Sequence, residues 1–137
     1  MNLINRNYNL FLDDFREPKD AFVYTKDTDF LKLDWVVVRN YEEFVSEIEN
    51  QYKAGCFPRV IAFDHDLADD HYIPLFITPY EEMTEKTGMH CAKWLIDFCI
   101  DNYLKLPSYK VHSQNPAGKA NIERLLTNFK KHQDTNE

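Results

Sequence analysis

Polar side chains that can do chemistry follow three short strand-like runs of the sequence. The runs 10–12, 60–63 and 109–111 are each followed directly by acidic, imidazole, hydroxyl or amide side chains. Runs of this length, bounded by polar residues, are typical of interior strands of a sheet. If the three strands are parallel neighbours, their carboxyl ends bring these side chains together. The candidate site residues are Asp13, Asp14, Asp64, His65, Asp66, His112, Ser113 and Asn115.

The carboxylates of Asp13, Asp14 and Asp64 are the candidate metal ligands. Ionised carboxylates held close together repel one another unless a cation joins them or one of them keeps its proton. Mg²⁺ or Mn²⁺ fits this requirement, because such ions prefer oxygen ligands, commonly one or two carboxylates together with substrate phosphate. The alternative is that Asp13 and Asp14 only cap the turn after a strand, a common use of aspartate.

His65 and His112 are candidate general acids or bases, because imidazole titrates near neutral pH. They can equally be nitrogen ligands of a softer metal, or hydrogen-bond the backbone without a chemical role. Asp66 is placed to orient His65 or a water. Polar residues at strand ends are expected to add little to core packing, so Asp64→Asn and His112→Ala should abolish turnover and leave thermal stability nearly unchanged.

Ser113, Asn115 and Arg16 are the candidate phosphate-binding residues. A helix is predicted to begin at Pro116, and the free amide groups and positive dipole end of its first turn would favour an anion in the same cleft. Asn115 can alternatively be no more than the cap of that helix. Arg16, just after the acidic pair, either contacts phosphate or neutralises one of the two carboxylates.

The elements that position these residues alternate between strands and helices. The β-branched run 35–38 predicts a further interior strand, and helical spacing of apolar residues predicts helices at about 41–54, 88–103 and from 116 onward. Such alternation implies a mostly parallel sheet with helices on both faces. We predict a three-layer, flavodoxin-like α/β fold with four strands in the order 2-1-3-4, since no sequence is left for a convincing fifth strand.

We expect one domain over residues 1–137, with a lid-like insertion at about 68–87. That segment holds two prolines and several acidic residues, and a connection of this length without an obvious element is usually a lid, a binding loop or disordered. The first strand is expected to begin near Tyr8 or Asn9. Pro58 is expected to stop the helix at about 41–54 from continuing. Residues 15–33 are expected to form a loop or a short helix.

Composition limits the partners. A net charge of −7 disfavours an extended nucleic-acid surface, so a small phosphorylated substrate or a nucleic-acid end is the expected partner. The apolar runs are far shorter than a membrane span needs, which predicts no membrane association. The first residues lack the layout of a secretory signal, and the three cysteines do not suggest a disulfide framework, so we expect a cytoplasmic protein.

Four motifs resemble the cyclic-phosphate processing receiver-like domain. They are Leu-Asp-Asp-x-Arg-x-Pro at 12–18, Phe-Asp-His-Asp-Leu at 63–67, Thr-Gly with Ala-Lys-Trp-Leu at 87–95, and Val-His-Ser-x-Asn-Pro-x-Gly-x-x-Asn-Ile at 111–122. The resemblance spans nearly the whole chain. It implies a receiver-type fold that hydrolyses cyclic phosphates, and it implies the same candidate site residues. An acidic residue is common in the family where this chain has His90.

The preferred interpretation is a metal-dependent phosphoesterase acting on a cyclic phosphate of a nucleotide or an RNA end. Asp64 would be a metal ligand or, alternatively, a nucleophile that forms a phospho-aspartyl intermediate. One alternative function is a stand-alone response-regulator receiver domain phosphorylated on Asp64, although such receivers use a lysine on a fifth strand. Two others are a haloacid-dehalogenase-like phosphatase using Asp64 and Asp66, and a non-catalytic cyclic-nucleotide-binding module.

Overall fold

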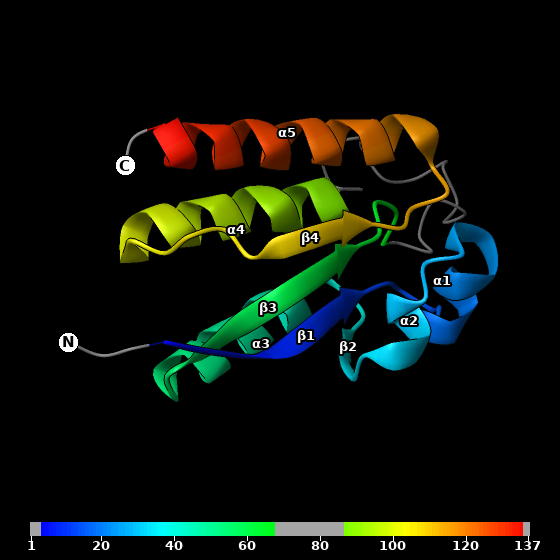
Figure 1. Ribbon diagram of the computed structural model, residues 1–137, viewed down its shortest axis with the longest axis horizontal. Coiled ribbons are helices and arrows are strands. Elements are labelled where there is room, and N and C mark those ends of the chain that lie inside the picture. Colours follow the sequence, from blue (N-terminus) through cyan, green and yellow to red (C-terminus); the bar gives the residue numbers. More distant parts are fainter. Residues whose placement is uncertain (1–3, 68–86, 136–137) are drawn as a thin grey trace, which may run out of the picture.

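The computed structural model describes residues 4–67 and 87–135. The lid-like insertion expected at about 68–87 therefore lies outside the described residues, apart from Thr87. The elements, shown in Figure 1, are β1 (Asn5–Leu12), α1 (Pro18–Thr25), α2 (Asp29–Lys32), β2 (Trp35–Val38), α3 (Tyr41–Lys53), β3 (Cys56–Phe63), α4 (Gly88–Asn102), β4 (Ser108–Val111) and α5 (Pro116–Thr135).

The four strands form one sheet in the order β2-β1-β3-β4, and every neighbouring pair is parallel. The predicted fold class and strand order are thereby confirmed. The strands also end level with one another: Leu12 pairs with Phe63, and Phe63 pairs with Val111. The next residue of each strand, Asp13, Asp64 or His112, therefore begins at the same edge of the sheet.

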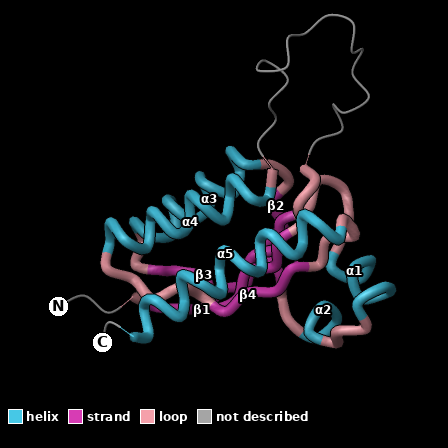
Figure 2. Tube along the Cα trace, turned by 90° about the horizontal axis from the view of Figure 1, so that it is seen from above, coloured by secondary structure: helices cyan, strands magenta, loops and turns pink. Residues whose placement is uncertain are grey.

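Helices cover both faces of the sheet, but unequally. The helices α3, α4 and α5 pack around the larger core, which takes Leu12 and Phe63 from the strands. In Figure 2 the shorter α1 and α2 lie together, apart from α3, α4 and α5. They pack against a smaller core that contains Phe11 and Ala62. Successive strand residues point to opposite faces, so Asp13 and Asp64 continue the face of Phe11 and Ala62, on the side of α1 and α2.

Two strands start earlier than expected. β1 begins at Asn5 rather than near Tyr8 or Asn9, and β3 includes Pro58, which was expected only to stop a helix. The register between β1 and β3 shifts on either side of Tyr8, the partner of Pro58. An irregular pairing tolerates a proline, which has no amide hydrogen to donate, and it also breaks the alternation that reveals a strand in the sequence.

The segment 15–33 holds two helices rather than one loop or short helix. Pro18 is the first residue of α1, where its missing amide hydrogen and fixed φ are tolerated. The backbone amide of Glu17 donates to the Asp20 carboxylate at 2.9 Å and so closes the first turn. The α1–α2 loop is fastened to β4 by Lys110, whose ammonium lies 2.8 Å from Asp27 and 3.1 Å from Asp29.

The helices α4 and α5 were predicted close to their observed bounds. Cys91 and Cys99 are free, buried thiols on the core side of α4. The helix that precedes β3 ends before Gly55, which has a positive φ of 87°. None of the described helices is long and apolar enough to cross a membrane.

Candidate functional site

Asp13, Asp64 and His112 form a buried cluster at the carboxyl edge of the sheet. One oxygen or nitrogen atom of each side chain lies within 4.8 Å of those of the other two. The three residues are 0%, 3% and 1% exposed. No other group of three acidic, histidine or cysteine side chains with this spacing occurs in the described part of the chain, and Asp14 lies outside the cluster.

Asp13 is held as a carboxylate by several donors. Its Oδ1 atom accepts hydrogen bonds from the backbone amides of Phe15 and Arg16, at 3.1 and 2.9 Å. Its Oδ2 atom lies 3.1 Å from His112 Nε2 and 3.7 Å from the Arg16 guanidinium. Burial alone would raise the pKa of Asp13, but the hydrogen bonds from His112 and the two amides outweigh burial and lower that pKa. Asp13 is therefore ionised at neutral pH.

Asp64 has the opposite electrostatic behaviour. Burial, and then the charge of Asp13, raise the pKa of Asp64 to about 7, although the backbone amide of His65 donates to its Oδ1 atom at 2.9 Å. Two buried carboxylates this close require a proton or a cation between them. The donor set of two carboxylates and one imidazole therefore suits a divalent metal ion that would replace the proton of Asp64.

His112 is packed as a core residue. Its ring stacks on Phe11 with a centroid distance of 4.5 Å and an interplanar angle of 10°, and it meets the ring of Phe30 edge-on at 5.7 Å. Burial lowers the pKa of His112 despite the neighbouring Asp13, so the imidazole is neutral at neutral pH. Its Nδ1 atom is buried without a hydrogen-bond partner. The expectation that His112 adds little to packing was wrong, because the strand end is covered by α1 and α2.

A second group of candidate residues is joined by Asp66. The Asp66 carboxylate lies 2.8 Å from His65 Nδ1, and the Asn115 side-chain amide donates to both of its oxygens at 3.3 Å. Asn115 Oδ1 also accepts from the backbone amide of Gly118 at 2.9 Å. Asn115 is thus the cap of α5 and in addition positions Asp66. Ser113 Oγ accepts from the Asn115 backbone amide at 3.0 Å, which ties the two candidate phosphate-binding residues together.

Two glycines allow α4 and α5 to approach the end of β3. A Cβ atom on Gly88 would lie 1.9 Å from the Asp64 carbonyl oxygen, and a Cβ atom on Gly118 would lie 2.3 Å from His65 Cγ. The Gly88 amide also donates to the His65 carbonyl oxygen at 2.8 Å. At Gly88 the obstacle is backbone, so that position accepts only glycine, whereas at Gly118 the obstacle is the His65 ring, which alanine would displace.

The first turn of α4 is closed by His90. The His90 Nδ1 atom accepts from the backbone amide of Thr87 at 2.9 Å, and the Thr87 hydroxyl accepts from the Met89 amide at 3.2 Å. An acidic side chain three residues after the cap commonly makes the first of these bonds. The His90 side chain therefore caps the first turn of α4. An acidic side chain at this position could accept the same hydrogen bond from the Thr87 amide.

Arg16 and Arg39 hold the loop that follows β1. The Arg16 guanidinium donates to Gln114 Oε1 at 2.9 Å, which links this loop to the one after β4. Arg39 donates to the carbonyl oxygens of Asp13 and Arg16, at 3.2 and 2.7 Å, and pairs with the Glu17 carboxylate. Arg39 was missed by the sequence analysis, although its position directly after the strand 35–38 places it at the same sheet edge.

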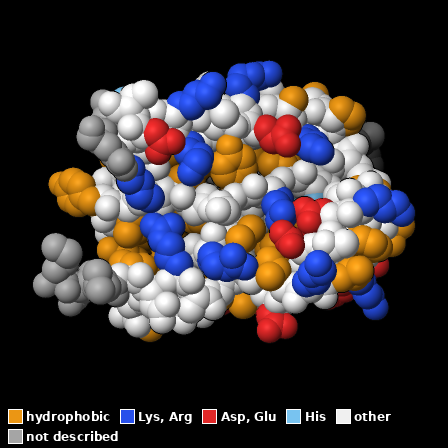
Figure 3. Space-filling model, viewed as in Figure 1, with side chains coloured by type: hydrophobic (Ala, Val, Ile, Leu, Met, Phe, Trp, Pro, Cys, Tyr) orange, Lys and Arg blue, Asp and Glu red, His pale blue; other side chains and the backbone are white. Residues whose placement is uncertain are grey.

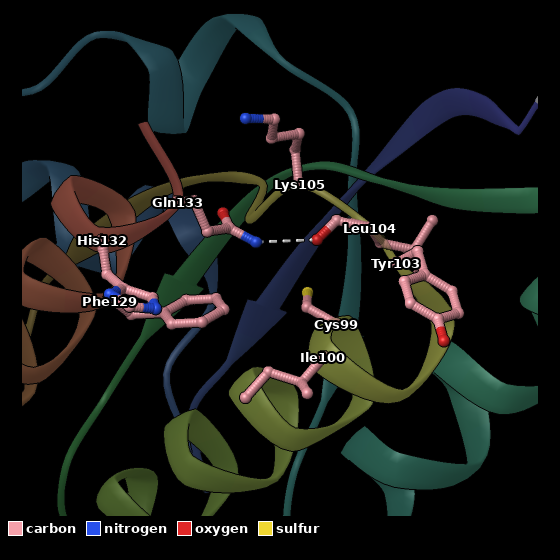
Figure 4. A pocket seen from close by; sticks show the side chains of 8 residues that line it. All are labelled: Cys99, Ile100, Tyr103, Leu104, Lys105, Phe129, His132 and Gln133. Carbon is pink, nitrogen blue, oxygen red and sulfur yellow. Dashed lines mark hydrogen bonds between the residues drawn. The ribbon is translucent and has the colours of Figure 1, made fainter. Parts of the chain in front are cut away.

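A cavity of about 320 Å³ lies at the opposite end of the sheet, between the carboxyl-terminal turns of α4 and α5 (Figure 4). Gln133 of α5 donates there to the Leu104 carbonyl oxygen at 2.9 Å. None of the candidate site residues lines this cavity. Its lining residues are Cys99, Ile100, Tyr103, Leu104, Lys105, Phe129, His132 and Gln133.

A family model described as the cyclic-phosphate processing Receiver domain matches residues 8–128. The matched range includes the clustered side chains of Asp13, Asp64 and His112. Comparisons with curated proteins and with solved structures gave no match. Because the family model covers most of the 137 residues and the sheet has the strand order of a receiver, the chain belongs to the family of cyclic-phosphate processing Receiver domains.

Proposed function

We propose that the protein is a metal-dependent phosphoesterase that hydrolyses a cyclic phosphate of a nucleotide or of an RNA end. The observation that carries this proposal is the buried cluster of Asp13, Asp64 and His112 at the carboxyl edge of a parallel sheet, where ligands of such folds bind. Asp13 also closes the turn after β1 and His112 also packs in the core, but neither role calls for a second buried carboxylate, Asp64, beside Asp13.

Asp13, Asp64 and His112 are the residues that would hold the metal ion. His112 is added to the set proposed from the sequence, whereas Asp14, which is not part of this close group, stays a candidate whose charge also acts on Asp64. A mixed oxygen and nitrogen donor set favours Mn²⁺ over Mg²⁺, which prefers oxygen ligands alone. When bound, the metal would supply Lewis-acid polarisation of the phosphodiester.

His65 is then the general acid of the proposed reaction. Its Nδ1 atom is engaged by Asp66 at 2.8 Å, which orients the ring and directs Nε2 toward the substrate. Water attacks the phosphorus atom, one of the two ribose oxygens leaves, and His65 gives that oxygen its proton. The proton released by the attacking water then returns to His65, so that the cyclic diester and water become a monoester with no net change in the protein. Asn115 supports this step by holding Asp66.

Arg16, Ser113 and the amino terminus of α5 would bind the phosphate oxygens. The Arg16 guanidinium lies 3.7 Å from Asp13 Oδ2 and also donates to Gln114 in the loop after β4. It therefore lies between the Asp13 carboxylate and that loop. In the absence of substrate this charge balances part of the negative charge of Asp13. The arrangement offers donors for a single phosphate group.

We favour a small substrate over a long nucleic acid on the basis of the charge of the protein. Lys and Arg side chains are interspersed with acidic and hydrophobic side chains over the face seen in Figure 3. The net charge of −7 adds a general repulsion of polyanions. We therefore expect a mononucleotide or the terminal nucleotide of an RNA to enter the site.

Hydrolysis of a panel of 2′,3′-cyclic, 3′,5′-cyclic and ADP-ribose cyclic phosphates, with Mn²⁺ or Mg²⁺, tests this proposal. We expect turnover of at least one member, and loss of that turnover in Asp64→Asn. Absence of turnover, together with metal-dependent labelling of Asp64 by a small phosphodonor, would instead establish a phosphorylated receiver. Binding of a cyclic nucleotide without turnover or labelling would point to a binding module.

A further inference from the structure

The hydroxyl group of Tyr24 is an unexplained polar atom beside the cluster. Tyr24 lies in the last turn of α1, and its ring packs against the smaller core. Its hydroxyl oxygen is buried and has no hydrogen-bond partner. Folded proteins leave few buried hydroxyl groups unpaired, and those that remain unpaired are commonly completed by a bound molecule.

The surroundings of this hydroxyl belong to the candidate site. The Arg16 guanidinium lies 5.4 Å from the centroid of the Tyr24 ring and 3.7 Å from Asp13 Oδ2. The charges of Arg16, Asp13, Asp64 and Asp20 all act on the hydroxyl group. Tyr24 therefore lies on the α1 side of the cluster, next to the arginine that pairs with the Asp13 carboxylate.

We propose that the Tyr24 hydroxyl donates a hydrogen bond to a phosphate oxygen of the ligand that binds at Asp13, Asp64 and His112. This inference rests on the proposed function, because it takes the ligand to carry a phosphate group. Tyr24 and Arg16 would then form a pair of neighbouring donors on one rim of the site. Such a pair suits an anion with several oxygens, and charge-assisted hydrogen bonds to phosphate are among the strongest in proteins.

The hydroxyl is suited to be a donor rather than a nucleophile or a metal ligand. Burial, together with the nearby carboxylates of Asp13 and Asp64, raises the pKa of Tyr24 to about 12, against the opposing effect of Arg16. The phenol therefore keeps its proton at neutral pH. A protonated phenol donates one hydrogen bond and binds cations weakly.

Tyr24→Phe removes only the oxygen atom, and the chain offers two matched controls. The Tyr8 hydroxyl is also buried without a partner, but Tyr8 packs against the larger core, near Glu47 and Cys56. The Tyr109 hydroxyl shares a hydrogen bond of 2.6 Å with the Thr127 hydroxyl. The first control removes an unpaired oxygen elsewhere, and the second removes a paired one.

The experiment measures two quantities for the full chain. The first is the melting temperature without ligand, and the second is its increase on adding inorganic phosphate, with and without Mn²⁺. We expect Tyr24→Phe to melt no lower than the wild type and to bind phosphate about tenfold more weakly, the effect of one lost hydrogen bond. Tyr8→Phe should bind phosphate like the wild type, and Tyr109→Phe should melt lower and bind phosphate normally.

Wild-type affinity for phosphate in Tyr24→Phe would overturn the inference and leave the proposed function intact. A fall in melting temperature as large as that of Tyr109→Phe would also overturn it, because the hydroxyl would then have a structural partner. If the wild type binds phosphate but hydrolyses no cyclic phosphate, the proposed hydrolysis fails while the comparison of variants still decides the role of Tyr24. If the wild type does not bind phosphate at all, the inference about Tyr24 is wrong, and turnover of the cyclic-phosphate panel decides the proposed function separately.

Discussion

Asp13 Oδ2 and His112 Nε2 lie 3.1 Å apart, although they follow β1 and β4, two strands that are not neighbours. The strand between them is β3, and the residue that follows β3 is Asp64. The contact between Asp13 and His112 thus passes across the end of the central strand and closes the cluster from both sides. This geometry makes the site sensitive to changes in each of the three strands.

Replacing His112 with alanine should remove a packed ring as well as a metal ligand. Because the ring is buried between Phe11 and Phe30, we expect His112→Ala to lower the free energy of unfolding by about 2–4 kcal/mol. Urea denaturation measures this loss. His112→Gln keeps most of the side-chain volume, so it should cost less stability and still weaken Mn²⁺ binding. Equal stability of His112→Ala and the wild type would contradict the packing described above.

The metal-free protein should lose stability as the pH rises past the pKa of Asp64. That pKa lies at about 7 in the folded protein and near 3.8 in the unfolded chain, so between these values the folded state binds the extra proton. The stabilising contribution is complete below about pH 4 and is lost as the pH rises through about 7. Burial and Asp13 cause this effect, which amounts to at most about 4 kcal/mol.

Asp64→Asn is the control for this pH dependence, because asparagine does not titrate. In EDTA, the stability of the wild type relative to Asp64→Asn should fall between pH 5 and pH 8, as measured by denaturation at each pH. The comparison removes the contributions that Asp13 and His112 make in both proteins. Addition of Mn²⁺ should restore the wild type at pH 8 and leave the variant unchanged. A constant difference between the two proteins would show that Asp64 is ionised throughout.

Alanine at Gly88 and at Gly118 should have different effects. The new Cβ at Gly88 meets the backbone carbonyl of Asp64, which cannot move alone, so we expect a loss of about 2–3 kcal/mol. At Gly118 it meets the His65 ring, which can rotate away. Gly118→Ala should therefore keep its stability, helped by the better helix propensity of alanine, and lose turnover.

Gly55→Ala separates these steric effects from backbone strain. Gly55 has a φ of 87° and no atom within 4 Å of its added Cβ, so its replacement should cost about 1 kcal/mol and leave turnover unchanged. Melting temperatures and turnover of the three variants provide the test. Full activity of Gly118→Ala would show that the position of the His65 ring is not required.

Removing the side chain of Asn115 should disturb the site more than it disturbs the fold. Asn115→Ala loses the cap of α5, worth about 1 kcal/mol, and also the two bonds to Asp66. Asn40→Ala is the matched control, because Asn40 caps α3 with a bond of 2.8 Å to the Glu43 amide and does not contact the cluster. Both variants should melt lower by similar amounts, whereas only Asn115→Ala should lose turnover. Equal activity of the two would limit Asn115 to capping.

The sequence predicted the strand order and the residues at three strand ends, because the buried runs and the polar residues after them are local patterns. It did not predict the early start of β1 or the inclusion of Pro58 in β3, because the register shift around Tyr8 depends on the partner strand. The burial of His112 also escaped prediction, since it results from α1 and α2 folding over the strand end.

The sequence analysis searched for polar residues directly after strand-like runs, so it missed side chains that lie elsewhere in the chain or act on the backbone. Tyr24 lies in a segment that was expected to be a loop or a short helix, and its ring lies 5.4 Å from the Arg16 guanidinium only because of tertiary packing. Arg39 acts on backbone carbonyls of the loop after β1, which no side-chain motif can reveal. The roles of Gly88 and Gly118 became clear only when the neighbouring backbone and ring were placed.

The contact between Asp13 and His112 joins residues 99 positions apart in the chain. Contacts of such long sequence separation form slowly, because closing a long loop costs conformational entropy before the contact contributes any stabilising energy. A nascent chain that has not yet supplied β4 contains both carboxylates but not the imidazole. Metal binding that needs all three residues would therefore occur only after β4 has joined the sheet. It would stabilise the completely folded chain over any partly folded one.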